Sequence, residues 1–356
     1  MKPSVMIRFA AMAVVLAGAG MAMGQVSDKP LTEKWAPSKW GKDDSAGSAN
    51  HTRNPANVKR AMSVIKQFKT VTLGKYYHRE MPTASGRTWN LTLTGTPNAG
   101  PFGDNAFTYH DELLTTEIGQ IGTQFDGPGH AGVTTSKGMF FYNGRMYPES
   151  YERGAGGRAV GLGPNGVEFP AEFGFVCRAV IVDAAAYRGV ERLPIPKKPG
   201  DIGIVTAADV KAILKKQGVA EPQAGDCVFL YTGHGNIWGN DVYKKMTSEQ
   251  RAKAREEFGA GEPGFGISAC EYLASKDVAL TGGDTSAVDS QPHGEKDSSH
   301  VVHCHNEMQT RRGIWNIENL DLKALVDAKI YEFAFIWAPL KMIGATGSPG
   351  NPIAIY

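Results

Sequence analysis

The sequence has almost no excess of charge of either sign. Lysine and arginine together number 38, and aspartate and glutamate 36, among 356 residues. If residues 1–24 are a cleaved leader, as argued next, their removal deletes two bases and no acid and leaves the two signs equal. Such a balance supplies no basic surface for nucleic acid or for an anionic membrane. We therefore expect neither as a partner.

Long apolar runs are absent after residue 24. No later stretch approaches the roughly 20 consecutive apolar residues that a membrane helix needs. The chain begins MKPSVMIRFAAMAVVLAGAGMAMG, with Lys2 and Arg8 before an apolar run and small residues after it. This pattern predicts a secretory signal cleaved between Gly24 and Gln25, and hence a periplasmic or secreted protein. A membrane anchor is the alternative, but the run is short and rich in alanine and glycine.

Cysteine is scarce, and its four copies form no CxxC pair. An exported protein could join Cys177, Cys227, Cys270 and Cys304 in disulfides, but sequence alone cannot assign the pairs. Cys177 and Cys227 lie in the apolar, strand-like runs FVCRAVIV and DCVFLY. Buried free thiols are the simpler interpretation for these two.

The remaining composition, 42% hydrophobic and 21% charged, suits a globular protein with a substantial core. Residues 25–55 are polar and interrupted by proline and glycine, which predicts an extended arm. Residues 56–356 show no repeat and no linker, so we expect a single α/β domain with a mixed sheet. Within it, residues 97–109 read as a glycine-rich loop, and residues 244–257 as a solvated charged helix. The predicted order alternates strands (70–77, 88–96, 178–187, 225–233, 278–284, 313–320, 330–340) with helices (55–68, 206–218, 268–277, 321–328).

The stretch QIGTQFDGPGH, residues 120–130, gathers amide, carboxylate and imidazole groups among glycines. On an extended strand, Gln120, Gln124 and Asp126 would share one face, and His130 could turn back over them. Carboxylate, imidazole and amide oxygen are all metal donors. A hydrogen-bonded strand end is the alternative, because the glycines are equally what a tight turn needs.

A second polar cluster, HVVHCHNEMQTRRGIWNIENL, spans residues 300–320. Its histidines, among them His305, could be ligands, a surface cluster, or packed beneath the sheet. Glu318 is more informative, because a carboxylate inside an apolar strand is costly unless it is paired or bound to a metal. Functional and structural roles both remain open for it. Cys304 stands beside two histidines, but adjacent strand residues point to opposite faces, so this neighbourhood does not indicate a nucleophilic thiol.

Four further residues are candidates for a substrate pocket. His234 and Asp284 each end a predicted strand at a glycine turn, where a side chain often faces substrate. Phe102 and Trp238 could supply apolar walls. A loop histidine, a turn-capping aspartate and ordinary core aromatics are the alternatives.

Five stretches of the chain together resemble the cyclase family, the group that includes bacterial kynurenine formamidase and isatin hydrolase. They are GTQFDGPGH, DCVFLYTGHG, EPGFGISACEYLASKDVALTGGDT, HNEMQTRRGIWNIENLDL and YEFAFIWAPLKMIGATGSPGNPIAI. The resemblance covers residues 40–356 in consistent order. It implies the swivelling β/β/α fold, a homodimer or larger assembly, and a metal-dependent hydrolytic site in residues 56–356.

The resemblance also implies roles for individual residues. The family pattern His-x-Gly-Thr-His-x-Asp-x-Pro-x-His is matched at Gly122, Thr123, Asp126, Pro128 and His130. It makes Asp126 a metal ligand, His130 a ligand or the catalytic base, and His305 with Glu318 the distal ligands. Gln120 and Gln124 occupy the two leading histidine positions, which is the departure from the pattern. If these amides also bind the ion, the oxygen-rich set favours Mn²⁺ or Mg²⁺ over the Zn²⁺ that imidazoles prefer.

The expected function is hydrolysis of a carbon–nitrogen bond in an aryl formamide or cyclic amide, as in tryptophan catabolism to kynurenine. The cofactor would be Mn²⁺ or Zn²⁺, with Mg²⁺ also acceptable. The double glutamine keeps an alternative open, namely a non-catalytic small-ligand-binding protein that has lost its metal. A cyclisation or a lactone opening at the same site is a third reading.

Overall fold

The structure is a computed structural model that describes residue 28 and residues 34–84, 86–94, 99–296 and 302–356. The predicted signal, residues 1–24, lies outside the described residues. Within the described part of the chain, no helix is both long and apolar enough to cross a membrane.

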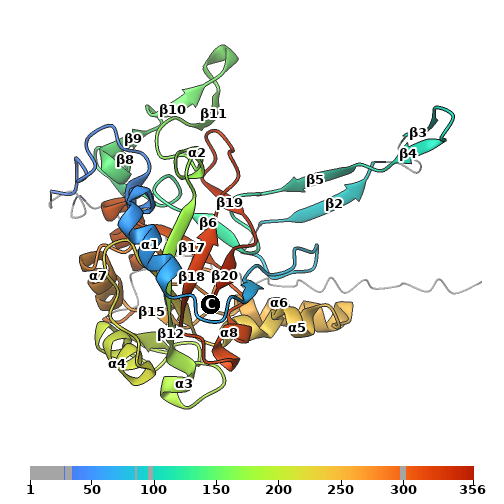
Figure 1. Ribbon diagram of the computed structural model, residues 1–356. Helices are drawn as coiled ribbons and strands as arrows, with labels where there is room; N and C mark the ends of the chain where they lie inside the picture. The colour runs from blue at the N-terminus through green and yellow to red at the C-terminus, as the bar shows by residue number, and fades with distance from the viewer. Residues whose placement is uncertain (1–27, 29–33, 85, 95–98, 297–301) are drawn as a thin grey trace, which may run out of the picture.

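A nine-stranded mixed sheet organises the chain, as the sequence predicts (Figure 1). Its four central strands run parallel, each joined to the next along the chain by a connection that contains a helix. Antiparallel strands complete both edges. In spatial order the strands are β1 (Thr70–Thr72), β20 (Ile353–Ile355), β18 (Glu332–Trp337), β12 (Phe175–Asp183), β14 (Cys227–Tyr231), β16 (Leu280–Gly283), β17 (Trp315–Glu318), β6 (Gln124–Asp126) and β19 (Gly347–Pro349).

Side chains alternate across this sheet and give it two apolar faces. Val180 and Val182 of β12 pack with α4 (Ala207–Gln217) and α7 (Ile267–Ser275) on one face. Ala179 and Ile181 of the same strand pack against a second, aromatic-rich cluster on the other. Strands buried on both faces read as continuous apolar runs, which is why these strands could be predicted.

Local signals fix the ends of the helices. Thr206 and Asp209 form a reciprocal capping box at the start of α4, and Gly218 ends it in the left-handed conformation. The predicted charged helix is confirmed as α6 (Ser248–Gly259), whose only buried side chains are Ala254 and Phe258. The other helices are α2 (Glu168–Ala171), α3 (Ala184–Arg188), α5 (Asn240–Tyr243), α8 (Lys323–Asp327), the 3₁₀ segments η3 (Tyr142–Gly144), η4 (Ala155–Gly157) and η5 (His234–Trp238), and the π-helix η6 (His305–Thr310).

The segment before residue 56 differs from the extended arm that its composition predicted. In its described part, residues 47–53 form the 3₁₀ helix η2 (Gly47–Arg53), which leads into α1 (Pro55–Ser63). Ala46 accepts a 2.7 Å hydrogen bond from the indole of Trp315, and Ser48 Oγ donates to Ala279 O at 2.6 Å. The polar composition of this segment predicted exposure to water, but groups of the segment instead form hydrogen bonds with residues of the sheet region.

A two-stranded ribbon projects away from the body of the molecule (Figure 1). Strands β2 (Trp89–Leu93) and β5 (Glu112–Thr116) form its stem, and β3 (Ala99–Phe102) and β4 (Phe107–Tyr109) pair at its far end. The predicted loop at 97–109 is therefore wrong for 99–102 and 107–109, which are strands. Three further small sheets are present in the described part of the chain. Two are antiparallel: β7 (Val133–Thr135) with β8 (Gly138–Phe141) and β9 (Arg145–Tyr147), and β10 (Tyr151–Arg153) with β11 (Ala159–Leu162). In the third, β13 (Ile204–Val205) pairs in parallel with β15 (Gly264–Phe265).

All four cysteines form disulfides. Cys177 bonds to Cys227 across the neighbouring strands β12 and β14, with their Cα atoms 6.0 Å apart. Cys270 of α7 bonds to Cys304 immediately before η6, with Cα atoms 5.5 Å apart. The expectation of free thiols at Cys177 and Cys227 was therefore wrong, because adjacent parallel strands bring two such residues within bonding range. The disulfide likewise removes Cys304 as a nucleophile.

Candidate metal centre

Strand pairing brings the two polar clusters of the sequence together. β6 pairs antiparallel with β17, so that Asp126 lies opposite Asn316 and Gln124 opposite Glu318. The strand is shorter than predicted, because Gly122 adopts φ +63° and ends the extended conformation. A Cβ atom at Gly122 would also come within 2.5 Å of the Tyr77 ring. Gln120 therefore does not continue the face that Gln124 and Asp126 share.

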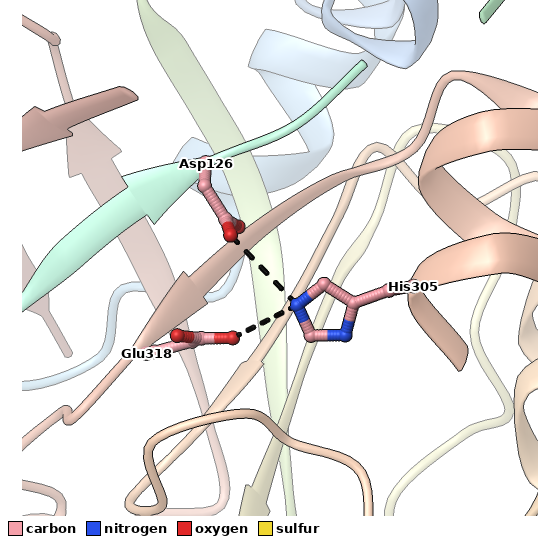
Figure 2. Close-up of side chains that lie close together, drawn as sticks. All are labelled: Asp126, His305 and Glu318. Carbon is pink, nitrogen blue, oxygen red and sulfur yellow. Dashed lines mark ion pairs between the residues drawn. The ribbon is translucent and has the colours of Figure 1, made fainter. Parts of the chain in front are cut away.

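Three buried side chains converge at this point (Figure 2). His305 Nε2 lies 3.3 Å from Glu318 Oε1 and 3.8 Å from Asp126 Oδ2. All three potential ligand atoms lie within 4.8 Å of one another. The carboxylates come from neighbouring strands and the imidazole from the first turn of the π-helix η6, an element often found at functional sites.

His305 is oriented from its other ring nitrogen. Its Nδ1 lies 2.7 Å from Asp289 Oδ2. The second oxygen of Asp289 accepts a 2.6 Å hydrogen bond from the backbone N–H of Cys304. A carboxylate behind the imidazole fixes the tautomer and leaves Nε2 facing the triad, as in histidines that bind metals.

Amide side chains hold the two carboxylates of the triad. Gln124 Nε2 donates to Glu318 Oε2 at 2.5 Å, and Asn316 Nδ2 donates to Glu318 Oε1 at 2.8 Å. Gln309 Nε2, one turn after His305, donates to Asp126 Oδ1 at 3.1 Å. In this arrangement Gln124 presents its nitrogen to a ligand of the triad, so its predicted role as an oxygen ligand stays a prediction.

Several oxygens around the triad are buried without a hydrogen-bond donor, which is the feature that fits a cation. Asp126 Oδ2 belongs to this group, and so does Oε1 of Gln309, whose Nε2 is bonded to Asp126. Gln120 Oε1 is also buried without a donor, while Gln120 Nε2 is bonded to Thr346 Oγ1 at 3.2 Å. Buried polar oxygens in native proteins nearly always have a partner. Two carboxylates, one imidazole and neighbouring amide oxygens are a suitable donor set for a divalent ion.

The electrostatics of the triad reflect two acids that are buried together. Burial and the nearby charge of Asp126 raise the pKa of Glu318 above its usual range. Burial alone would also raise the pKa of Asp126, but His305 and His130 outweigh it and lower that pKa. For His305, the three neighbouring carboxylates of Asp126, Asp289 and Glu318 overcome burial and raise the pKa well above normal. A divalent cation would compensate the negative charge of the two buried carboxylates better than a single proton would.

His130 lies beside the triad on a turn after β6. Its Nε2 is 3.5 Å from Asp126 Oδ2, and its ring centroid is 6.3 Å from that of His305. Burial lowers the pKa of His130, and the charges of His305 and Arg87 lower it further against the opposing effect of Asp126. The imidazole is therefore held in its neutral form, able to accept a proton. The adjacent Gly127 lies against the Trp315 ring, where a Cβ would meet Cε3 at 2.2 Å.

None of the four residues predicted to line a substrate pocket belongs to the triad. His234 is buried against Phe258, with ring centroids 4.8 Å apart. Trp238 packs into the same cluster at 5.8 Å from Phe258. Asp284 is buried and accepts hydrogen bonds from Thr232 and from the Gly235 backbone. Phe102 is exposed on β3, at the far end of the ribbon (Figure 1). Their role in substrate binding stays a prediction.

The Cyclase family model matches residues 65–290, more than half of the chain. The chain belongs to the cyclase family. Among solved structures, a crystal structure titled as a novel cyclase covers 89% of this chain and 98% of its own, with 24% identity and a TM-score of 0.69. Isatin hydrolase A from Ralstonia solanacearum covers 84% of this chain and 94% of its own, with 20% identity and a TM-score of 0.52.

A further isatin hydrolase, bound to the product analogue thioisatinate, covers 81% of this chain and 92% of its own, with 19% identity and a TM-score of 0.51. A search of the curated proteins found no match. At these identities the solved cyclase-family structures establish the fold of this chain.

Three residues of the centre were missed by sequence reasoning. Asn316 could have been found, because it shares a strand face with Glu318. Gln309 stands four residues after His305, a spacing that indicates one helix face, but the stretch was not predicted to be helical. Asp289 lies in an irregular loop where no periodicity exists to place it.

Proposed function

We propose that this cyclase-family protein is a metal-dependent hydrolase that cleaves a carbon–nitrogen bond of an aryl formamide or a cyclic amide. The observation that carries the proposal is the buried triad of Asp126, His305 and Glu318 with an unpartnered Asp126 oxygen. The fold shared with isatin hydrolases supports the substrate class. A kynurenine-formamidase type of activity, in tryptophan catabolism, is the specific form that we propose.

Asp126, His305 and Glu318 would hold the divalent ion, with Gln120 Oε1 and Gln309 Oε1 available as further oxygen donors. When bound, such an ion supplies Lewis acidity and makes hydroxide available near neutral pH. The oxygen-rich set favours Mn²⁺, with Zn²⁺ and Mg²⁺ as the other candidates.

The proton chemistry falls to His130. Its neutral imidazole, 3.5 Å from Asp126 through Nε2, would accept the proton of the attacking water. The same nitrogen would then return that proton to the leaving amine nitrogen. Asp126 would stabilise the imidazolium between the two transfers, because its carboxylate faces the ring that gains the charge.

The test is an assay of the mature chain, purified with Mn²⁺, on N-formylkynurenine and on isatin. We expect the wild type to hydrolyse at least one of these two substrates. The His130→Ala variant should lose about 100-fold or more in kcat. Asp126→Ala should also lose bound metal. Equal turnover by both variants and the wild type would overturn the assignment of the site.

A non-catalytic ligand-binding protein is the second candidate, favoured by the glutamines at positions 120 and 124. Elemental analysis distinguishes the two. Stoichiometric metal that survives dialysis supports the enzyme, whereas a metal-free protein that still binds an aryl amide supports the binding protein.

We also propose that the mature chain works in the periplasm or outside the cell, and as a homodimer or larger homo-oligomer. Two disulfides support the first proposal, because they persist in oxidising compartments. The projecting ribbon supports the second, since an isolated two-stranded hairpin is marginally stable in water and this one exposes Leu91, Leu93 and Leu113. Light scattering of wild type and a Leu93→Glu/Leu113→Glu variant tests it; a monomeric wild type would contradict the proposal.

A further inference from the structure

The proposed mechanism leaves one cationic side chain near the metal centre, Arg87, without a role. Arg87 lies two residues before β2 and is half-buried. Its Nη1 donates a 2.8 Å hydrogen bond to the backbone carbonyl of Gln120. Because Gln120 begins the stretch that carries Asp126 and His130, this bond fixes the guanidinium to the same loop as the site.

The charge of Arg87 is felt at the site itself. After burial and the charge of His305, Arg87 is the remaining contributor that lowers the pKa of His130. It also contributes, after His305 and His130, to the lowered pKa of Asp126. Together with the hydrogen bond to Gln120 O, these effects place the guanidinium near Asp126 and His130.

Arg87 also lacks a carboxylate partner, a feature that it shares with the half-buried Arg145 and Arg255 among the described residues but not with several other arginines. Arg60, Arg178 and Arg251 are buried or half-buried too, and each forms an ion pair at 2.6–2.9 Å. Among the described residues, Arg87 has no such pair. Glu117, whose pKa is lowered mainly by the Thr88 backbone N–H and only lastly by Arg87, is bonded to that N–H at 2.7 Å.

A guanidinium presents five donors in a planar fork, and one backbone carbonyl uses only one of them. The remaining donors match a carboxylate, which a guanidinium binds through two parallel hydrogen bonds. The remaining chain is close to neutral, so a single unpaired cation at the site is a local feature rather than part of a basic surface. The unpaired guanidinium of Arg87 is therefore suited to bind an anion that comes from outside the chain.

We propose that Arg87 binds a carboxylate of the substrate, so that the enzyme selects formamides or cyclic amides bearing a free carboxylate over neutral ones. This inference rests on the proposed function and narrows its substrate class. It favours an N-formyl aryl amine with an acid group, such as N-formylkynurenine, over the uncharged isatin.

The first test measures binding without turnover. Benzoate and benzamide have nearly the same shape but differ in charge, and neither has a formyl group to release. Calorimetry on the Mn²⁺-loaded protein should show that Arg87→Met weakens benzoate binding about 10- to 100-fold and leaves benzamide unchanged. Arg87→Lys should restore part of the difference. Arg158→Met, which removes the same charge from an exposed position, is the matched control and should bind both probes as the wild type does.

Kinetics then separate this role from direct stabilisation of the transition state. On N-formylanthranilate the Arg87→Met variant should show a raised KM and a nearly unchanged kcat, and on neutral formanilide no change. An equal fall in kcat on both substrates would identify Arg87 as an oxyanion stabiliser and overturn the inference. Benzoate binding that ignores the substitution, as expected if that carboxylate contacts only the metal, would overturn it too.

The two proposals fail in different ways. If the wild type binds benzoate through Arg87 but hydrolyses no formamide, the proposed function is wrong and the anion site stands. If it hydrolyses formanilide and N-formylanthranilate with equal kcat/KM, the function stands and the selection by Arg87 is wrong.

Discussion

Asp289 illustrates how much a single residue outside the triad contributes to the site. It contacts His305 Nδ1 at 2.7 Å and is itself held by the backbone N–H of Cys304 at 2.6 Å. The ring is therefore pinned from behind, with Nε2 directed at Asp126 and Glu318. A carboxylate in this position also makes the imidazole a stronger donor.

We expect Asp289→Asn to lower Mn²⁺ affinity about 10- to 100-fold, because a neutral amide keeps the shape but loses the charge behind His305. Competition with a metal-binding dye measures the effect. Asp327→Asn, which removes a carboxylate with a side chain that is 59% exposed, is the control and should bind Mn²⁺ normally. Unchanged affinity in Asp289→Asn would show that Asp289 does not position the ligand.

His234 gives a residue-scale prediction about pH. Burial lowers its pKa to about 4, despite a weak hydrogen bond with Phe258 O. In the unfolded chain the same imidazole has a pKa of about 6.5. Between these values the unfolded state binds more protons, so the free energy of unfolding rises with pH. The contribution is fully present above pH 6.5 and is lost as pH falls towards 4.

Urea unfolding at pH 4.5 and at pH 7 tests this point. The wild type should gain about 2 kcal/mol more than His234→Gln over that interval. His110→Gln, at an exposed histidine, should behave like the wild type. A His234→Gln variant with the full wild-type pH dependence would contradict the assignment of His234 as a buried, neutral group.

At the scale of elements, the π-helix η6 matters most, because it delivers His305 and Gln309 to the two carboxylates. The Cys270–Cys304 disulfide ties the residue immediately before η6 to α7. Closing a loop of 34 residues should stabilise the fold by about 4 kcal/mol in the chain-entropy account, and so should the 50-residue loop of Cys177–Cys227. The two disulfides should therefore stabilise the fold by a similar amount, but only Cys270–Cys304 adjoins a residue of the triad.

We expect Cys270→Ser/Cys304→Ser to lose metal affinity as well as stability, because the start of η6 is released. Cys177→Ser/Cys227→Ser, with a bridge between β12 and β14, should lose a similar stability and bind metal normally. Denaturant unfolding and dye competition measure the two quantities. Equal metal affinity in both variants would mean that the bridge does not position His305.

The elements that could be predicted from sequence are those with strong local signals. The buried strands β12 and β14 appear as continuous apolar runs, and α4 has its capping box and its terminal glycine. The 120–130 stretch was predicted less well, because Gly122 at φ +63° stops the strand that would align Gln120 with Asp126. Glycine adopts either sign of φ readily, so the sequence does not show which one occurs at Gly122, nor that the Tyr77 ring lies against it.

The candidate site shows the same division. The resemblance to the family pattern implied a metal-binding role for Asp126, His305 and Glu318, and the structure brings the three side chains together. The hydrogen bonds from Gln124 to Glu318 and from Gln309 to Asp126 could not be predicted, since they depend on the register of β6 with β17 and on a π-helix. Arg87 and Asp289 lie in irregular segments, where only the tertiary structure places a side chain.

For the whole molecule, the triad joins parts of the chain that are far apart in sequence. Asp126 lies on β6 near one edge of the sheet, and Glu318 and His305 come from the last third of the chain. Two buried carboxylates repel each other unless a cation or a proton lies between them. A bound ion would therefore link these segments in the folded state and have no comparable site in the unfolded one.

We expect removal of the ion to lower the melting temperature of the entire protein. At a free Mn²⁺ concentration of 100 times Kd, binding to the folded state alone adds about 2.7 kcal/mol. For a chain of this size that corresponds to a rise of roughly 4 °C. The protein dialysed against a chelator should recover this shift on addition of Mn²⁺. Glu318→Gln, which keeps the side-chain shape but removes one ligand charge, should show little or none. A wild type whose melting temperature is the same with chelator and with Mn²⁺ has no metal centre at this position, because an ion bound only to the folded state cannot leave the equilibrium unchanged.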